Sequence, residues 1–257
     1  MPTDGKSGSS KRAAAQRRIA EKRAAEAAAR AHAERRRRTV IGSAVAAVLV
    51  VVAVVVGIVV QTQRTSTSAK LAIPAHTVDS GYAIPVGTAG AKVTVDLYED
   101  FQCPNCKAFE DASGSTLAAF IAAGTVQARY HGMAFLDTAA NHNYSTRALN
   151  AAGAVVDDAG STAFQKFHQL LFANQPPETG GGLSDAQLTS YAQQAGATDA
   201  KVATEIKDLT FGEWVKASTD QASKDGVTST PTVLVDGKRL TDLSPAGLTA
   251  AVNTAKG

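Results

Sequence analysis

The sequence predicts an α/β domain that follows a single transmembrane helix. Three observations lead to this prediction: an apolar segment near the N-terminus, strand-like alternation at both ends of the region behind it, and helical periodicity in between. The chain has 257 residues, enough for one or two ordinary domains. Its composition, 44% hydrophobic and 19% charged, excludes a collagen-like or low-complexity protein.

The first 38 residues are a basic arm. They contain 12 Lys and Arg against 4 Asp and Glu, whereas the rest of the chain contains 14 against 19 and is acidic. This balance excludes a nucleic-acid-binding protein of the basic type. Ile19 is the only large aliphatic residue between positions 11 and 38, so the arm brings no core. We expect a solvated cytoplasmic arm, with contact to an anionic leaflet or to nucleic acid as the alternative.

Residues 39–60 are the predicted transmembrane helix. They carry no charge, and a helix of this length rises about 33 Å, enough to cross a bilayer core. Four arginines, residues 35–38, stand immediately before the segment, whereas only Arg64 and Lys70 follow closely. We therefore expect the N-terminus inside and the next domain outside. A cleaved signal peptide is the alternative, but its apolar core is shorter, about 7 to 15 residues. Residues 61–77, rich in Thr, Ser and Ala, are the expected linker.

The outer domain, residues 78–257, begins with a strand that leads into a helix. Residues 92–98 alternate with β-branched side chains on one parity. Two cysteines follow where the helix starts, and Pro104 suits the first helical position because its φ is already helical. Gly124 is placed to end this helix, and residues 125–131 predict a second strand.

Residues 139–225 have helical periodicity throughout, which fits four or five helices. Ser184 and Gln187 form a capping-box pattern at the start of one of them. Residues 175–182, with two prolines and three glycines, break regular structure before that helix. Trp214, the only tryptophan, is interpreted as a packing residue of this block.

The C-terminal part predicts a hairpin and a closing helix. Residues 232–235 and 239–240 flank Asp236-Gly237, which is a strong signal for a tight turn. Residues 244–255 then have a helical pattern behind Pro245. The predicted order is therefore β, α, β, a block of helices, β, β, α.

The two cysteines, Cys103 and Cys106, indicate redox chemistry. They are too few for a disulfide framework, and His131, His142 and His168 lack ligand spacing, so these histidines are interpreted as ordinary residues and no metal is expected. Free N–H groups and the helix dipole stabilise a thiolate at a helix start, which makes Cys103 the expected nucleophile. Cys106 would then resolve the mixed disulfide. A structural disulfide is the alternative, but closing so short a loop gains little stability.

Three segments together resemble the DsbA-like family of thioredoxin-fold proteins, in its membrane-anchored actinobacterial form. They are Phe101-Gln-Cys-Pro-Asn-Cys106, Phe164 to Phe172, and Gly226 to Gly237. The resemblance covers roughly residues 84–255. It implies a thioredoxin-like fold with an inserted helical domain, at about residues 139–225, and it implies no cofactor.

The resemblance also implies roles near the cysteines. Pro231 matches a family proline that is held cis, and Thr230 before it would offer its backbone to an incoming peptide. Pro104 and Asn105 lie between the cysteines at the start of the active-site helix. Asn105 stands where strongly oxidising members often carry histidine, so the redox potential is left open.

One further departure concerns proton transfer. Many relatives carry a buried carboxylate six residues before the first cysteine, where this chain has Leu97. Asp96 and Glu99 are the candidate proton acceptors in its place. The alternative is that both carboxylates face water or pair with a lysine.

These observations predict a membrane-tethered thiol:disulfide oxidoreductase that oxidises cysteine pairs in exported proteins, outside the cytoplasmic membrane. The resemblance implies a membrane partner of the DsbB or vitamin K epoxide reductase type that reoxidises the enzyme. A reductase or isomerase using the same sulfurs is one alternative. A non-enzymatic anchored binding module is the other.

Overall fold

The computed structural model describes residues 71–257, which contain the whole of the predicted outer domain. The predicted basic arm, the transmembrane helix at 39–60 and most of the linker lie outside these residues. Among the helices from residue 71 onward, none combines the length and the apolar character that a membrane span requires.

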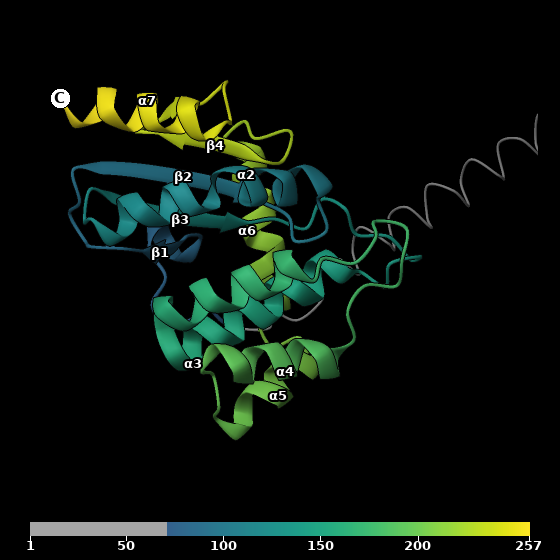
Figure 1. Cartoon of the computed structure of the whole chain (residues 1–257). Helices are drawn as coiled ribbons and strands as arrows, with labels where there is room; N and C mark the ends of the chain where they lie inside the picture. Colours follow the sequence, from purple (N-terminus) through teal and green to yellow (C-terminus); the bar gives the residue numbers. More distant parts are fainter. Residues whose placement is uncertain (1–70) are drawn as a thin grey trace, which may run out of the picture. The chain divides into compact units, whose positions relative to one another are not determined.

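The centre of the domain is a five-stranded mixed sheet with the strand order β1-β3-β2-β4-β5 (Figure 1). Strands β2 and β3 are parallel, and every other neighbouring pair is antiparallel. The bounds are β1 Ile84–Val86, β2 Val93–Glu99, β3 Val126–Gly132, β4 Thr232–Val235 and β5 Lys238–Arg239. The β2, β3 and hairpin predictions are therefore confirmed within two residues at each end.

Two helices cover one face of the sheet and one covers the other. Helices α2 and α7 pack against each other and against the central strands, while α6 contacts β3 from the opposite face. Helices α3, α4 and α5 gather beside β1 (Figure 1). The bounds are η1 Asp79–Gly81, α2 Pro104–Ala122, α3 Tyr144–Ala173, α4 Asp185–Ala195, α5 Ala200–Lys207, α6 Gly212–Lys224 and α7 Pro245–Lys256.

The predicted helical block is confirmed, with one irregularity in its longest member. Gly160 interrupts α3 with φ 72° and ψ −169°, a conformation that is accessible to glycine and strained for other residues. The capping box at Ser184 is present, since its hydroxyl accepts from the Gln187 N–H and the Gln187 side chain bonds back to the Ser184 N–H. Four helices, one of them in two segments, therefore lie between residues 139 and 225.

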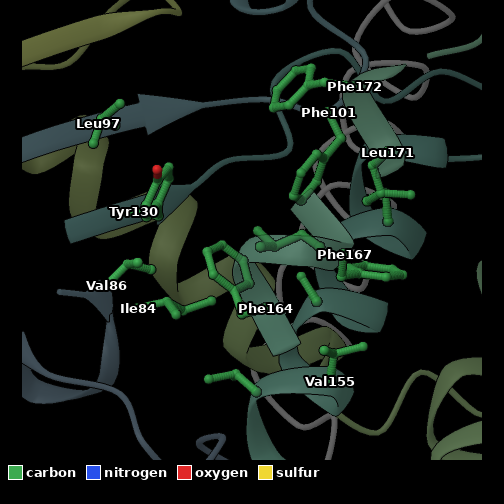
Figure 2. Close-up of a cluster of buried hydrophobic side chains, with 14 of the residues drawn as sticks. Ile84, Val86, Leu97, Phe101, Tyr130, Val155, Phe164, Phe167, Leu171 and Phe172 are labelled. Atoms are coloured by element: carbon green, nitrogen blue, oxygen red, sulfur yellow. The ribbon is translucent and has the colours of Figure 1, made fainter. Parts of the chain in front are cut away.

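The sheet and the inserted helices share one hydrophobic core. Phe164, Phe167 and Leu171 of α3 belong to the same buried cluster as Leu97 and Tyr130 of the central strands (Figure 2). Each such side chain contributes about 1.5–3 kcal/mol when it is fully buried. Because this packing fixes α3 against the sheet, polar residues of α3 can be held next to the end of β2.

The short strand β1 was not predicted. It has only three residues, and its central residue is Pro85, which cannot donate to a neighbouring strand. The structure accommodates the proline because β1 is an edge strand.

Candidate active site

The cysteine pair lies at the start of α2, as predicted. Cys103 is the N-cap residue, with extended backbone, and Pro104 is the first helical residue. The Cys103 carbonyl accepts hydrogen bonds from the N–H groups of Cys106 (3.1 Å) and Lys107 (3.2 Å). Both thiols are free, and Cys106 is fully buried one turn behind Cys103. The local sequence thus builds a helix start around two sulfurs.

The two sulfurs have opposite acidities. A hydrogen bond from the Cys106 thiol lowers the pKa of Cys103 to about 5 against the effect of burial, and hydrogen bonds from Thr230 and from the Cys106 and Asn105 N–H groups contribute. The pKa of Cys106 is held well above its ordinary value by its bond to Cys103, by burial and by the charge of Glu99. At neutral pH the site therefore contains a thiolate at Cys103 and a thiol at Cys106.

The loop before β4 lies against Cys103, although the two are 127 residues apart in the chain. The Thr230–Pro231 peptide bond is cis, which agrees with the resemblance. Cys103 Sγ is 3.4 Å from the Thr230 carbonyl oxygen, to which the neutral thiol donates. An open groove of about 500 Å³ begins at this point, lined by Cys103, Pro104, Asn105, Phe135, Leu136, Glu178, Thr228, Ser229 and Thr230.

Glu99, at the end of β2, lies in a buried group of ionisable side chains behind the cysteines. Its Oε2 is 2.8 Å from Nε2 of His168. One carboxylate oxygen each of Glu99 and Glu110 and one ring nitrogen of His168 lie within 4.8 Å of one another. Burial raises the pKa of Glu99 to about 8 and that of Glu110 to about 7, and it lowers the pKa of His168. Near neutral pH the two carboxyl groups therefore retain protons that they can exchange with Cys106.

The structure separates the two candidate proton acceptors. Asp96 and Glu99 point to opposite faces of β2 because successive side chains alternate along a strand. Asp96 Oδ1 is 3.1 Å from Nε2 of His131, whose ring stacks on Tyr98 with the ring centroids 4.3 Å apart. Only Glu99 therefore lies in the buried group next to Cys106, and neither carboxylate pairs with a lysine from residue 71 onward.

The structure gives His131 and His168 partners that the sequence did not predict. Each is paired with a carboxylate, but the partners lie 35 and 69 residues away in the chain, so no local spacing marks them. Two groups within residues 71–257 have side chains of the types that bind divalent cations: Glu99, Glu110 and His168, and Asp79, Asp96 and His131. Both histidines contact a carboxylate directly. The expectation that no metal takes part stays a prediction.

Asp100, which the sequence did not single out, fixes the segment before the cysteines. It is fully buried, and its carboxylate accepts from the Gln102 N–H (2.8 Å), the Leu136 N–H (3.0 Å) and the Ser145 hydroxyl (2.6 Å). Burial raises its pKa to about 6. One carboxylate thus ties the turn after β2 to the groove wall and to the start of α3.

These buried carboxyl groups predict that stability falls as the pH rises from 5 to 8. The pKa values of Glu99 and Glu110 are about 8 and about 7 in the folded protein, above their ordinary 4.5, so the folded chain binds more protons than the unfolded chain in this interval. The stabilisation is complete below pH 4.5 and is lost as the pH passes the folded values. We expect a loss of about 1–3 kcal/mol, measured by urea unfolding in Cys103→Ser, where that thiol does not titrate.

Glu99→Gln in the same background is the matched variant, because glutamine keeps the shape and cannot titrate. Its unfolding free energy should depend less on pH between 5 and 8 than that of the parent. A parent protein whose stability rises over this interval would contradict the assignment of raised pKa values to the cluster.

The sheet order, the helix that starts at two cysteines and the cis-proline loop beside them define a protein of the thiol–disulfide exchange class. Comparison with known proteins supports this class. A family model described as thioredoxin matches residues 79–254. The crystal structure of reduced DsbA from Mycobacterium tuberculosis is 33% identical, with a TM-score of 0.62, and the match covers 69% of this chain and 93% of that one. MdbA, a thiol-disulfide oxidoreductase from Corynebacterium diphtheriae, is 26% identical with a TM-score of 0.56, covering 68% and 89% of the two chains.

A curated relative shows how the similar region occurs in a larger protein. The serine/threonine-protein kinase PknE of Mycobacterium tuberculosis is 33% identical over 116 residues, which are 44% of this chain. The match spans 20% of the length of the kinase.

The chain belongs to the thioredoxin family and, within it, to the DsbA-like thiol:disulfide oxidoreductases.

Proposed function

We propose that this protein is tethered to the cytoplasmic membrane and oxidises cysteine pairs in exported proteins outside it. The observation that carries the proposal is the stabilised thiolate of Cys103, at an open groove, with the buried thiol of Cys106 behind it. A thiolate that is stabilised in the reduced form makes the corresponding disulfide easier to reduce, and hence a stronger oxidant.

The reaction starts from the Cys103–Cys106 disulfide. A substrate thiolate attacks Cys103 Sγ, the bond between the two enzyme sulfurs breaks, and Cys106 leaves as a thiolate that takes up a proton. The second substrate thiolate then attacks the substrate sulfur of the mixed disulfide and releases Cys103 as a thiolate. Two electrons pass from the substrate to the enzyme, and the substrate gains a disulfide.

Glu99 is the proton donor and acceptor for Cys106 in this proposal. It is buried, its charge raises the pKa of Cys106, and Glu110 stands one turn after Cys106 on the same helix face. When substrate reduces the enzyme, the cluster gives a proton to Cys106. When the enzyme is reoxidised, the cluster takes that proton back.

The groove is the proposed peptide site. The Thr230 backbone lies at its rim beside the reacting sulfur, where it can hydrogen-bond an extended peptide, and Pro231 shapes the loop. Phe135 also lines the groove, is 38% exposed, and offers an apolar surface to an unfolded chain.

The direction of electron flow is tested by equilibrating the protein with glutathione buffers and measuring the oxidised fraction by mass spectrometry. A potential near about −120 mV supports an oxidase, and one near about −270 mV supports a reductase. We expect the first value, because the pKa of Cys103 is about 5, which stabilises the reduced form. A value at the reducing end would overturn the oxidising direction.

The tether rests on the uncharged segment 39–60 and the arginines before it. We expect the full chain to stay with the membrane fraction after washing with salt and alkali. We expect protease added to cells without a wall to degrade the cysteine domain. Recovery of the full chain in the soluble fraction would contradict the tether.

A membrane partner of the DsbB or vitamin K epoxide reductase type is the proposed source of oxidising equivalents.

A further inference from the structure

The loop between α3 and α4 is fastened to the cysteine segment by Gln102. This side chain is fully buried, and its Nε2 donates to the carbonyl oxygens of Pro176 (3.3 Å) and Pro177 (3.0 Å). Glu178, the next residue of that loop, lines the groove that begins at Cys103. The inserted helical block thus contributes one wall of the proposed peptide site.

A second glutamine makes the reciprocal connection from the loop. Gln175 Nε2 donates to the carbonyl oxygens of Phe101 (3.0 Å) and Cys103 (2.9 Å). Four hydrogen bonds therefore join the two segments, and all four end on backbone carbonyls. Since the loop cannot shift along the cysteine segment without breaking them, the backbone that leads into Glu178 is fixed relative to the reacting sulfur.

Glu178 is the source of fixed charge in the groove. The other lining residues, apart from Cys103 itself, are uncharged. Glu178 is exposed and takes part in none of the ion pairs formed within residues 71–257. The groove therefore contains both an exposed aromatic ring, Phe135, and a carboxylate with no ion-pair partner among the described residues.

We propose that Glu178 is a specificity-determining residue, which favours substrates with a lysine or arginine close to the cysteine that attacks Cys103. This inference rests on the proposed function and names the substrate class of the same site. A cationic side chain gains the attraction of the Glu178 carboxylate while its cysteine reaches the sulfur. An acidic side chain in the same place is repelled. Because Glu178 is exposed, the effect has the size of a surface ion pair, about two- to fivefold in rate.

The test measures the rate at which dithiol peptides reduce the Cys103–Cys106 disulfide of the oxidised protein. Three peptides differ only in the residue two positions after the attacking cysteine, which is Lys, Gln or Glu. A lysine also lowers the pKa of the peptide's own cysteine, so the deciding quantity is the Lys-to-Gln rate ratio compared between protein variants.

Glu178→Gln is expected to lower the Lys-to-Gln rate ratio about two- to fivefold, and Glu178→Lys to lower it further and favour the Glu peptide. The difference between wild type and Glu178→Gln should shrink in 0.5 M salt, because exposed charges are screened. Glu213→Gln is the matched control: Glu213 is an exposed glutamate of α6 that does not line the groove, so the ratio should not change.

Reduction by dithiothreitol, an uncharged dithiol, separates this inference from the function on which it rests. All variants should be reduced by it. At Glu178 the rate should change by no more than about two- to fivefold, because the attacking thiolate is itself an anion near that exposed charge. A disulfide that neither dithiothreitol nor any peptide reduces would overturn the proposed function. Normal reduction with a Lys-to-Gln ratio that Glu178→Gln leaves unchanged would overturn only the role of Glu178.

Discussion

Cys103→Ser is expected to abolish oxidation of a reduced, unfolded substrate. A serine hydroxyl cannot form the disulfide that accepts electrons, and the Cys106 sulfur is fully buried behind it, so no second sulfur is available to the substrate. The measurement is oxidative refolding of a reduced protein with two disulfides, with regain of its activity as the readout. With this variant, the substrate should regain activity no faster than in the uncatalysed background reaction.

Cys106→Ser is expected to behave differently, because it leaves the Cys103 thiolate in place and removes the sulfur that resolves it. This variant should accumulate mixed disulfides, which form when its Cys103 thiolate attacks a disulfide of an oxidised substrate and the other substrate sulfur leaves as a thiolate. They would appear as slower bands on a non-reducing gel and disappear on reduction, and mass spectrometry of the adducts would name the substrates. Wild-type behaviour of both variants would favour the anchored binding module over an enzyme. Circular dichroism of both variants checks that each is folded.

Trp214→Ala is expected to cost about 3–5 kcal/mol in the free energy of unfolding, the largest stability effect predicted for one side chain. The Trp214 side chain is 1% exposed, and its Nε1 donates to the Gly81 carbonyl oxygen at 2.6 Å. An added Cβ at Gly153 would lie 3.2 Å from its ring, which shows how closely α3 and α6 approach. Urea unfolding followed by far-ultraviolet circular dichroism measures the loss.

Trp214→Phe separates packing from hydrogen bonding at this position. Phenylalanine keeps an aromatic ring but leaves the Gly81 carbonyl without its indole donor, so we expect a smaller loss of about 1–3 kcal/mol. A loss below about 1 kcal/mol for the alanine variant would contradict the packing role that the sequence already indicated for Trp214.

The elements that hold the cysteines were predictable because their signals are local. The alternation before the cysteines, the proline after Cys103 and Asp236-Gly237 each describe a stretch of a few residues. Asp236 and Gly237 illustrate this. Their φ angles are both positive, 46° and 74°, as a tight hairpin turn of this kind requires. The short strand around Pro85 could not be predicted from a local signal, because its pairing with β3 is set by tertiary structure and not by its own pattern.

The buried acid–base group was predicted only in part, again for a physical reason. Glu99 shares the parity of Val95 and Leu97, so strand alternation alone could have placed it on the apolar face and Asp96 on the other. Glu110 could have been found from its four-residue spacing to Cys106 on one helix. His168 carries no such signal, because α3 reaches the end of β2 only through packing of the shared core.

The second half of α3 and the loop that follows it therefore have a double connection to the sulfur pair. His168 contacts the carboxyl group behind the cysteines, and Gln175, two helical turns further along the chain, holds the loop in front of them. A chimera that receives residues 161–178 from a relative would exchange its proton-handling partner and its charge preference in one step. Variation among such enzymes in acidity and in substrate choice should then be inherited together.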